Sequence, residues 1–306
     1  MKTIIIGAGM AGLSAAQILN QKGHEVIILD KGRGVGGRMS TRTIEHGKAD
    51  HGAQYFSVKT PEFQALISEL QSENITVSWK LAQRENERYI GANGMNTIPK
   101  KMAEKLTICL NEKAILISEN EVKTESGNSF SFDYLIITIP IPQVIELFRN
   151  SKIDFSKKDK SVFENIEYDP CIAVMAVLKQ PTQISTGGII LENQPVTWIA
   201  DNFQKGISSI PTVTLHASAE FSKKHLEDDL LEVSKNMLSS VSQWITPENI
   251  VSSQVHRWRY SNAIKRYKEP FYQLQNQNIY LAGDGFGIGN VEGAFLSGYL
   301  CSLSIS

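Results

Sequence analysis

The sequence predicts an α/β fold, with a parallel sheet formed first by the N-terminal segment and the strands of a separate sheet after about residue 151. The first supporting observation is an apolar run at residues 3–6, followed by a glycine-rich turn and an alanine-rich segment of helical character at residues 11–20. A second apolar run at residues 26–29 completes a strand–helix–strand pattern. A continuous apolar run at residues 134–139 is typical of a buried parallel strand, and the prolines after it end the strand.

The other elements follow in chain order. Apolar side chains at helical spacing predict a helix over residues 61–72, with Pro61 in its first turn. Further helices are expected at residues 96–106, 225–241 and from 290, and an exposed turn at residues 50–55. Two strands are expected at residues 75–79 and 88–90, and a meander of short strands at 106–110, 114–118, 121–124 and 129–132. The strands of a separate sheet are expected at 171–178, 188–191, 197–200 and 211–217. A last strand is expected at 279–282.

The first glycine-rich turn indicates a dinucleotide. Gly7 permits the tight turn, Gly9 lets the backbone approach a phosphate, and Gly12 lets the helix pack closely on the strand. Unpaired N–H groups and the positive end of the helix dipole favour a pyrophosphate there. Asp30 lies 18 residues after Gly12, where an acid accepts hydrogen bonds from ribose hydroxyls. Its charge also disfavours a 2′-phosphate, so NADP is not expected in this site.

A second glycine-rich segment, GRGVGGR at residues 32–38, decides between dinucleotides. An NAD dehydrogenase needs no such turn after the ribose-binding acid, whereas flavoenzymes of the glutathione-reductase and amine-oxidase types have one and bind an extended FAD. Arg38 is the expected pyrophosphate ligand, because a guanidinium suits phosphate in a bidentate manner. Arg33 is either a second ligand or a solvated surface arginine. The candidate cofactor residues of this region are Gly7, Gly9, Ala11, Gly12, Asp30, Lys31, Arg33, Gly37 and Arg38.

Composition excludes several classes of protein. The 306 residues are 42% hydrophobic and 21% charged, which is ordinary for a globular chain long enough for two lobes. A net charge of −1 predicts no nucleic-acid or anionic-membrane partner. Three distant cysteines without CxxC spacing predict neither disulfides nor a metal site, and they fit a reducing cytoplasm. The sequence contains no run of 18 or more apolar residues, so no membrane span is predicted. The apolar N-terminus is not expected to be a signal peptide, because no clear cleavage site follows it.

Several segments, which span residues 3 to about 300, go beyond these patterns. They are IIIGAGMAGLSAA, DKGRGVGGRMSTR, ADHGAQYF, GANGMNTIPK, LHASAEFS, RWRY and LAGDGFG with VEGAFLSG. Together they resemble the renalase family, especially its bacterial members. The first and last are shared by the wider flavin amine-oxidase superfamily, whereas ADHGAQYF, LHASAEFS and RWRY are more particular to the renalase branch.

The resemblance implies noncovalent FAD in a Rossmann-type domain of p-hydroxybenzoate-hydroxylase topology, joined to a smaller α+β substrate domain on an antiparallel sheet. It implies oxidation of the 2- and 6-dihydro isomers of NAD(P) to NAD(P)+. Electrons pass to FAD and then to O2, which gives hydrogen peroxide. The expected partners are therefore these dihydronicotinamide dinucleotides and O2. The expected FAD-binding domain covers residues 1–60, 91–150 and 250–306, and the expected substrate domain covers residues 61–90 and 151–249.

Further cofactor residues are carried over from the family pattern. Asp284, after Gly283, is expected to bind a ribityl hydroxyl or else to cap its turn. The N–H groups near Val291 and Glu292, at a helix start, suit the flavin N1–C2=O edge. Gln54 and Tyr55 match a turn beside the isoalloxazine, where Tyr55 forms a flat wall or else packs at the domain hinge. Ile115 matches an adenine-contacting position or is an ordinary strand residue.

The candidate catalytic residues are mostly aromatic. Trp198, His216, Trp258 and Tyr260 belong to the substrate-domain motifs or their junction, and Tyr55 joins them. Aromatic walls can hold a dihydronicotinamide parallel to the flavin, with the donor carbon about 3–3.5 Å from N5. Hydride transfer from a dihydropyridine needs no base, since the ring nitrogen supplies the electrons. His216 is then a hydrogen-bonding anchor or a structural histidine.

Three other functions stay open from the sequence. An amine oxidase of the same superfamily is one, although many such enzymes keep a lysine near flavin N5 and no lysine can be assigned there. A flavin-bearing binding or redox-sensing module without turnover is another. A simple NAD dehydrogenase would be a colourless protein, so a visible flavin spectrum separates it from the rest.

Overall fold

The computed structural model describes residues 1–192, 195–275 and 277–306, and the chain forms two compact units of similar length. Unit 1 consists of Met1–Gly37, Pro99–Glu167 and Ala263–Ser306, and unit 2 of Arg38–Ile98 and Tyr168–Asn262. These units differ from the predicted domains at residues 38–60, 91–98, 151–167 and 250–262. The functional division of the chain stays a prediction.

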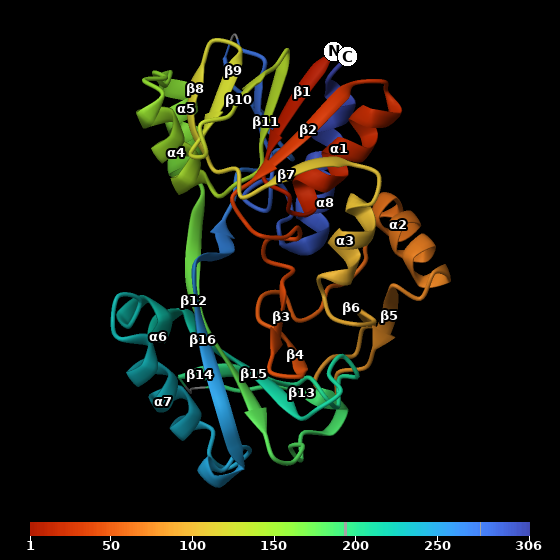
Figure 1. Cartoon of the computed structure of the whole chain (residues 1–306), viewed down its shortest axis with the longest axis vertical. Coiled ribbons are helices and arrows are strands. Elements are labelled where there is room, and N and C mark those ends of the chain that lie inside the picture. The colour runs from red at the N-terminus through yellow and green to blue at the C-terminus, as the bar shows by residue number, and fades with distance from the viewer. Residues whose placement is uncertain (193–194, 276) are drawn as a thin grey trace. The chain divides into compact units, whose positions relative to one another are not determined.

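A six-stranded sheet forms the centre of unit 1, in the order β17–β18–β11–β1–β2–β7. Figure 1 labels its strands β11, β1, β2 and β7. Ile4, Ile5 and Ile136 are fully buried, as expected for parallel strands that are covered on both faces. The strand–helix–strand prediction and the buried strand near residue 134 are therefore confirmed. The parallel strands are β1 (Lys2–Ile6), β2 (Glu25–Asp30), β7 (Thr107–Leu110), β11 (Tyr134–Ile137) and β18 (Ile279–Leu281), with β17 (Tyr272–Gln273) antiparallel at the edge.

Helices α1 (Met10–Gln21) and α8 (Asn290–Ser304) lie side by side in unit 1 (Figure 1). The approach is close because a Cβ at Gly298 would lie 1.9 Å from the Ala11 carbonyl oxygen. Strands β8, β9 and β10 form a three-stranded antiparallel sheet, which packs with α4. The expected meander was wrong in its first strand, because β7 pairs in parallel with β2 instead. The remaining elements here are β8 (Ala114–Ser118), β9 (Glu121–Thr124), β10 (Ser129–Ser131), α4 (Ile141–Asn150), α5 (Lys157–Glu164) and α3 (Thr97–Ala103), which crosses the unit boundary.

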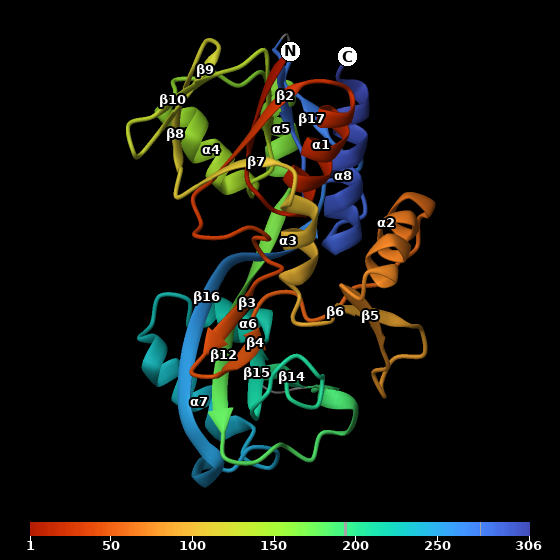
Figure 2. The same ribbon diagram turned by 45° about the vertical axis from the view of Figure 1, so that its right-hand side comes forward.

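Unit 2 is built on a five-stranded sheet in the order β13–β14–β15–β12–β16, whose first three pairs are antiparallel. One face packs on α7, and the other packs on a hairpin of β3 and β4 (Figure 2). Its elements are β3 (Thr41–Ile44), β4 (Gly47–Asp50), α2 (Pro61–Ser72), β5 (Thr76–Trp79), β6 (Arg88–Gly91), β12 (Glu167–Leu178), η1 (Ser185–Gly187), β13 (Gly188–Ile190), β14 (Val196–Asp201), β15 (Thr212–Ala217), α6 (Ala219–Lys224), α7 (Leu230–Ser240), η2 (Pro247–Asn249) and β16 (Ile250–Lys265).

Two local predictions in unit 2 were wrong. The helix expected over residues 225–241 begins later, at Leu230, because Asp229 caps α7 by accepting hydrogen bonds from the N–H groups of Leu231 and Glu232. The turn at residues 50–55 is not exposed throughout, since Asp50 is 0% and Gln54 7% exposed. In the described parts of the chain, no helix is long and apolar enough to span a membrane.

Candidate functional site

The dinucleotide turn of unit 1 has the geometry its glycines predict. Gly7 has φ +110°, and a Cβ there would lie 2.5 Å from Thr138 Oγ1. A Cβ at Gly12 would lie 1.9 Å from the Gly7 carbonyl oxygen, so the helix can pack on the turn only with glycine. Gly9 precedes α1 without a side-chain cap, and a Cβ there would meet nothing within 4 Å. The first turn of α1 thus begins at an open, uncapped end that suits an anion.

Asp30 joins the two glycine-rich segments. Its Oδ2 accepts from the Ala8 N–H and its Oδ1 from the Gly32 N–H, each at 2.6 Å. The Gly36 N–H donates to the Ala8 carbonyl at 2.8 Å, which holds the second segment against the first. Each carboxylate oxygen keeps a further lone pair, so a ribose hydroxyl can still donate to Asp30.

The flanking cofactor candidates of unit 1 are more exposed. Lys31 and Arg33 are partly or fully exposed, and Lys31 Nζ donates to Gln143 Oε1 at 3.3 Å. A Cβ at Gly37 would lie 3.8 Å from Gly9 Cα, so this glycine lies next to the first turn. Ile115 is 37% exposed on β8. Their contacts with a cofactor stay predictions.

The predicted C-terminal cofactor residues surround a second uncapped helix start. Gly283 has φ +136°, and its N–H donates to Ser297 Oγ of α8 at 2.7 Å. Asp284 and Glu292 are both buried, at 8% and 4% exposure. Helix α8 begins after Gly289 with no side-chain cap, so the first N–H groups, near Val291, remain suited to an anionic group.

Arg38 belongs to unit 2. Its Nη1 donates to the carbonyl oxygens of Tyr260 at 3.2 Å and Ser261 at 3.1 Å. A Cβ at Gly52 would lie 1.9 Å from the Arg38 carbonyl oxygen, so Gly52 is required for this close approach. In the structure the guanidinium therefore anchors β16 to the segment before β3, and its role as a phosphate ligand stays a prediction.

Two of the predicted catalytic residues lie opposite each other on one face of the unit 2 sheet. Trp198 of β14 pairs with His216 of β15. Their neighbours Ile199 and Leu215 point into the core against α7, so Trp198 and His216 point to the other face. Trp258 Nε1 donates to the His51 carbonyl at 2.8 Å, and His216 Nε2 donates to the same oxygen at 3.3 Å. The structure thus brings the side chains of His216 and Trp258 to one backbone oxygen.

Tyr55 and Trp198 are two members of an aromatic cluster whose third member is Trp79. Tyr55 lies 5.6 Å from Trp198 and 5.9 Å from Trp79, and the two tryptophans lie 6.2 Å apart, measured between ring centroids. The Arg88 guanidinium lies 5.8 Å from the Tyr55 ring centroid. The fifth predicted residue, Tyr260, instead packs edge-on against Tyr168, with centroids 5.9 Å apart.

Three buried polar atoms near these residues have no hydrogen-bond partner within the described part of the chain. They are Trp198 Nε1, Gln54 Oε1 and His51 Nδ1. The amide nitrogen of Gln54, by contrast, donates to the carbonyls of Asp50 at 2.6 Å and Gly52 at 3.1 Å. A buried donor or acceptor without a partner is costly, and such atoms are often completed by a ligand or by water.

The histidines of this face are held neutral by their surroundings. Burial lowers the pKa of His216 to about 4, and the charge of Lys205 adds to the effect. Burial lowers the pKa of His51 to about 3, with the neighbouring His256 and Arg42 contributing. At neutral pH both imidazole rings are therefore neutral, and neither can act as a general acid in its imidazolium form.

These shifts predict a pH dependence of stability. An unfolded histidine has a pKa of about 6.5, so between that pH and about 4 the unfolded chain binds more protons than the folded one. The free energy of unfolding should therefore fall as the pH drops through this window, by at most about 1.4 kcal/mol per pH unit for each histidine. Urea unfolding at several pH values measures it. His216→Gln should flatten the curve, whereas substitution of the exposed His46 should not.

A fully buried ion pair underlies the Gln54–Tyr55 turn. Lys205 Nζ lies 2.8 Å from Asp50 Oδ2, and both side chains are 0% exposed. The same Nζ donates to the Gln54 carbonyl at 2.7 Å. Sequence reasoning missed Lys205, Trp79 and His256, because none of them belongs to a quoted motif and no local spacing marks them, although His256 directly precedes RWRY.

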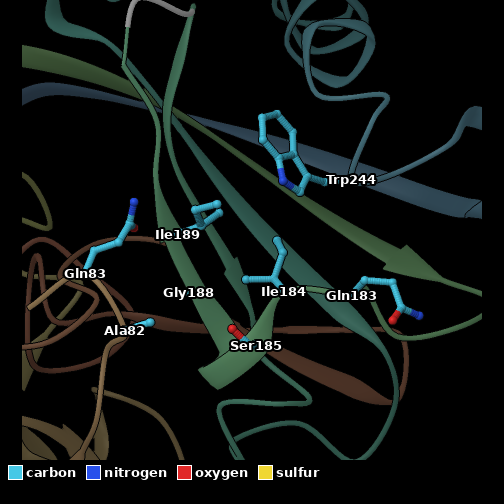
Figure 3. A pocket seen from close by; sticks show the side chains of 8 residues that line it. All are labelled: Ala82, Gln83, Gln183, Ile184, Ser185, Gly188, Ile189 and Trp244. Carbon is cyan, nitrogen blue, oxygen red and sulfur yellow. The ribbon is translucent and has the colours of Figure 1, made fainter.

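The structure also contains an open pocket in unit 2 (Figure 3), with a volume of about 230 Å³. It is lined by Ala82, Gln83, Gln183, Ile184, Ser185, Gly188, Ile189 and Trp244. None of the predicted site residues lines it. A Cβ at Gly188 would lie 2.7 Å from Trp198 and 2.8 Å from Trp79, so this residue of the pocket lining lies against two rings of the aromatic cluster.

Comparison with protein families gives two matches. The flavin containing amine oxidoreductase family matches residues 74–305, and the NAD(P)-binding Rossmann-like domain matches residues 5–70. Renalase of Mus musculus is 24% identical over 329 aligned residues, which cover 97% of this chain and 96% of that protein. An L-amino-acid oxidase of Crotalus adamanteus is also 24% identical, over 82% of this chain and 48% of that protein. The resemblance to renalase is confirmed over the full length.

Solved structures share the fold. Putrescine oxidase bound to putrescine superimposes with a TM-score of 0.74 at 16% identity, over 100% of this chain and 99% of that one. A putative protoporphyrinogen oxidase from Exiguobacterium sp. 255-15 has a TM-score of 0.68 at 13% identity, over 99% and 98% of the two chains. With the Rossmann-like match, these likenesses confirm the predicted α/β FAD-binding fold.

Proposed function

The chain belongs to the flavin containing amine oxidoreductase family, and from this premise we propose that it is an oxidase of 2- and 6-dihydroNAD(P) isomers. It is an FAD-dependent oxidoreductase and a renalase-like member of its superfamily. In the proposed reaction the dihydronicotinamide loses a hydride and becomes NAD(P)+. O2 takes up the two electrons and the proton of that hydride, together with one further proton from solvent, and gives hydrogen peroxide. A reducing cytoplasmic location, which the three free cysteines favour, is part of the proposal.

FAD is the cofactor, and it is held without a covalent bond. The residues of unit 1 fit it: the open, uncapped start of α1 at Gly9 suits a pyrophosphate, and Asp30 suits a ribose. When bound, FAD supplies a two-electron acceptor. The proposed ligands are Gly7, Gly9, Ala11, Gly12, Asp30, Lys31, Arg33, Gly37, Arg38, Gln54, Tyr55, Ile115, Gly283, Asp284, Val291 and Glu292.

The observation that carries the proposed substrate is the cluster of Tyr55, Trp79 and Trp198. Its rings lie within 6.2 Å of one another, centroid to centroid. Flat aromatic faces can orient a planar dihydropyridine, and orientation is most of what hydride transfer requires. The partnerless Trp198 Nε1 is the proposed donor to the carboxamide of the substrate. Trp258, Tyr260 and Tyr55 stay proposed substrate contacts.

The neutral histidines support the same chemistry. A dihydropyridine donates its hydride with electrons from its own ring nitrogen, so no side chain has to remove a proton. His216, with its pKa lowered to about 4 by burial, is uncharged at neutral pH and already bonded to the His51 carbonyl. We therefore propose His216 as a hydrogen-bonding anchor of this face.

Oxygen uptake tests the proposal against an amine oxidase. We expect the purified holoprotein to consume O2 and form hydrogen peroxide with 6-dihydroNAD or 2-dihydroNAD, and to consume little with ordinary NADH. Putrescine and benzylamine serve as primary-amine controls. Faster uptake with either amine would favour the amine oxidase, and no uptake with any of these substrates would favour a flavin-bearing redox module.

One observation bears on the amine-oxidase alternative. The buried lysine of unit 2 near the Gln54–Tyr55 turn is Lys205, and its ammonium is already engaged by Asp50 and by the Gln54 carbonyl. It also lies 5.3 Å from the centroid of the Trp79 ring. Because the ammonium is already bound by these protein groups, Lys205 is disfavoured as the lysine that an amine oxidase would keep near flavin N5.

A further inference from the structure

Lys205 touches both the turn that carries Tyr55 and the ring on which Tyr55 packs. Its Nζ donates to the main-chain oxygen of Gln54 at 2.7 Å, and that oxygen belongs to the peptide group leading into Tyr55. The same Nζ lies 5.3 Å from the centroid of Trp79, within the range of a cation–π contact. The Lys205 ammonium thus contacts the Trp79 ring and the peptide group that leads into Tyr55, and Trp79 and Tyr55 are two of the three residues of the aromatic cluster.

Asp50 holds this charge in place. Its Oδ2 binds Lys205 at 2.8 Å, and its Oδ1 accepts from Thr41 Oγ1 at 2.6 Å and from the Met95 N–H at 2.9 Å. The Lys205 backbone is fixed as well, because its N–H donates to the Asp201 carbonyl at 2.8 Å. The ammonium and the carboxylate therefore tie together several segments of unit 2 that lie far apart in the sequence.

Stability alone does not account for such a pair. Removing two charges from water costs several kcal/mol per ion, and apolar residues of similar volume often stabilise a fold equally well or better. A buried pair can instead specify one arrangement of the groups around it. Here those groups are the Gln54 peptide and the Trp79 ring, whose Nε1 is bonded to the Thr186 carbonyl at 2.9 Å.

We propose that Lys205 is a positioning residue of the substrate site, which acts through the Gln54 carbonyl and the Trp79 ring to set the orientation of Tyr55. The proposal rests on the proposed function for the identity of the substrate. Lys205 does not touch the reacting atoms in this account. Because the aromatic cluster both binds and orients the dihydronicotinamide, removal of Lys205 should weaken substrate binding and also slow hydride transfer from the bound substrate.

The test compares Lys205→Met with the double variant Asp50→Asn/Lys205→Met, both as holoprotein. The double variant keeps an acceptor oxygen for Thr41 and Met95 and leaves no unpaired charge, so it should fold. Anaerobic flavin reduction at increasing 6-dihydroNAD gives the half-saturating concentration and the limiting rate separately. We expect the half-saturating concentration to rise about tenfold or more in both variants, and the limiting rate to fall as well. The matched control is Lys235→Met, which removes an exposed ion-paired lysine of α7 and should leave both values unchanged.

A double variant that folds and keeps the wild-type half-saturating concentration would overturn the proposal, because Lys205 would then serve stability only. If neither methionine variant folds, Lys205→Arg decides, since it keeps the charge opposite Asp50 but alters the geometry at Gln54. A raised half-saturating concentration in Lys205→Arg supports positioning, and a wild-type value contradicts it.

A readout without substrate keeps this proposal separate from the proposed function. Near-ultraviolet circular dichroism reports the packing of Trp79, and we expect its tryptophan bands to change in the Lys205 variants at unchanged far-ultraviolet signal. If wild-type flavin is not reduced by any dihydronicotinamide, the proposed substrate is wrong while this measurement still tests the positioning. Unchanged tryptophan bands in a folded Lys205→Met variant would contradict it.

Discussion

Asp50→Ala is expected to lower the free energy of unfolding by about 3–5 kcal/mol, which is one of the two largest effects that the structure predicts. The substitution leaves the Lys205 ammonium buried, with its side chain 0% exposed and without its counter-ion. It also removes the acceptor of Thr41 Oγ1 and of the Met95 N–H. Urea unfolding followed by circular dichroism measures the loss as a shift of the midpoint at constant slope.

The control for this prediction is Glu232→Ala. Glu232 pairs with Lys235 on the surface of α7, with both side chains more than 70% exposed, and such pairs contribute little to stability. A loss for Asp50→Ala no larger than that for Glu232→Ala would mean that the buried pair is solvated in solution, and it would remove the basis for the role of Lys205.

Gly12→Ala is expected to abolish FAD binding. The new Cβ would lie 1.9 Å from the Gly7 carbonyl oxygen and 3.1 Å from the Gly7 carbonyl carbon, and both are backbone atoms that cannot rotate away. Helix α1 must then move off the turn, which displaces the N–H groups that face the pyrophosphate. The ratio of the flavin band to the protein absorbance after purification measures bound cofactor.

Gly23→Asn is the matched control, at the other end of α1. Gly23 has φ +84°, a Cβ there would meet nothing within 4 Å, and asparagine tolerates this backbone region better than other residues with a side chain. This variant should keep its flavin. A Gly12→Ala protein that purifies with a full complement of FAD would show that the turn does not form the pyrophosphate site.

The cofactor half of the account could be predicted from the sequence because its signals are local. Gly7, Gly9 and Gly12 lie in one turn, and Asp30 follows at the end of the next strand, so spacing alone places them together. Helix α2 matched its predicted bounds for the same reason, with Pro61 at its start. Where local signals conflicted, prediction failed: Asp229 caps α7 inside an apolar pattern that looked continuous.

The substrate half depends on contacts between distant residues. Asp50 and Lys205 are 155 positions apart, and neither has a neighbour in sequence that marks an ion pair. Trp198 and His216 become neighbours only through the register of β14 and β15. Strand β16 was not predicted, because polar residues interrupt the alternation of apolar and polar side chains along it. Pairing with the rest of the five-stranded sheet outweighs this weak local preference for a strand.

We propose that the nucleotide fingerprint binds the electron acceptor, while a dihydronicotinamide is the substrate. Anaerobic titration of the holoprotein with 6-dihydroNAD, followed at the flavin absorbance band, tests it most directly. We expect about one equivalent of 6-dihydroNAD to bleach the flavin band rapidly and to be converted to NAD+. Ordinary NADH at the same concentration should bleach the band little. Equal or faster bleaching by a primary amine, or none by any dihydronicotinamide isomer, would contradict it.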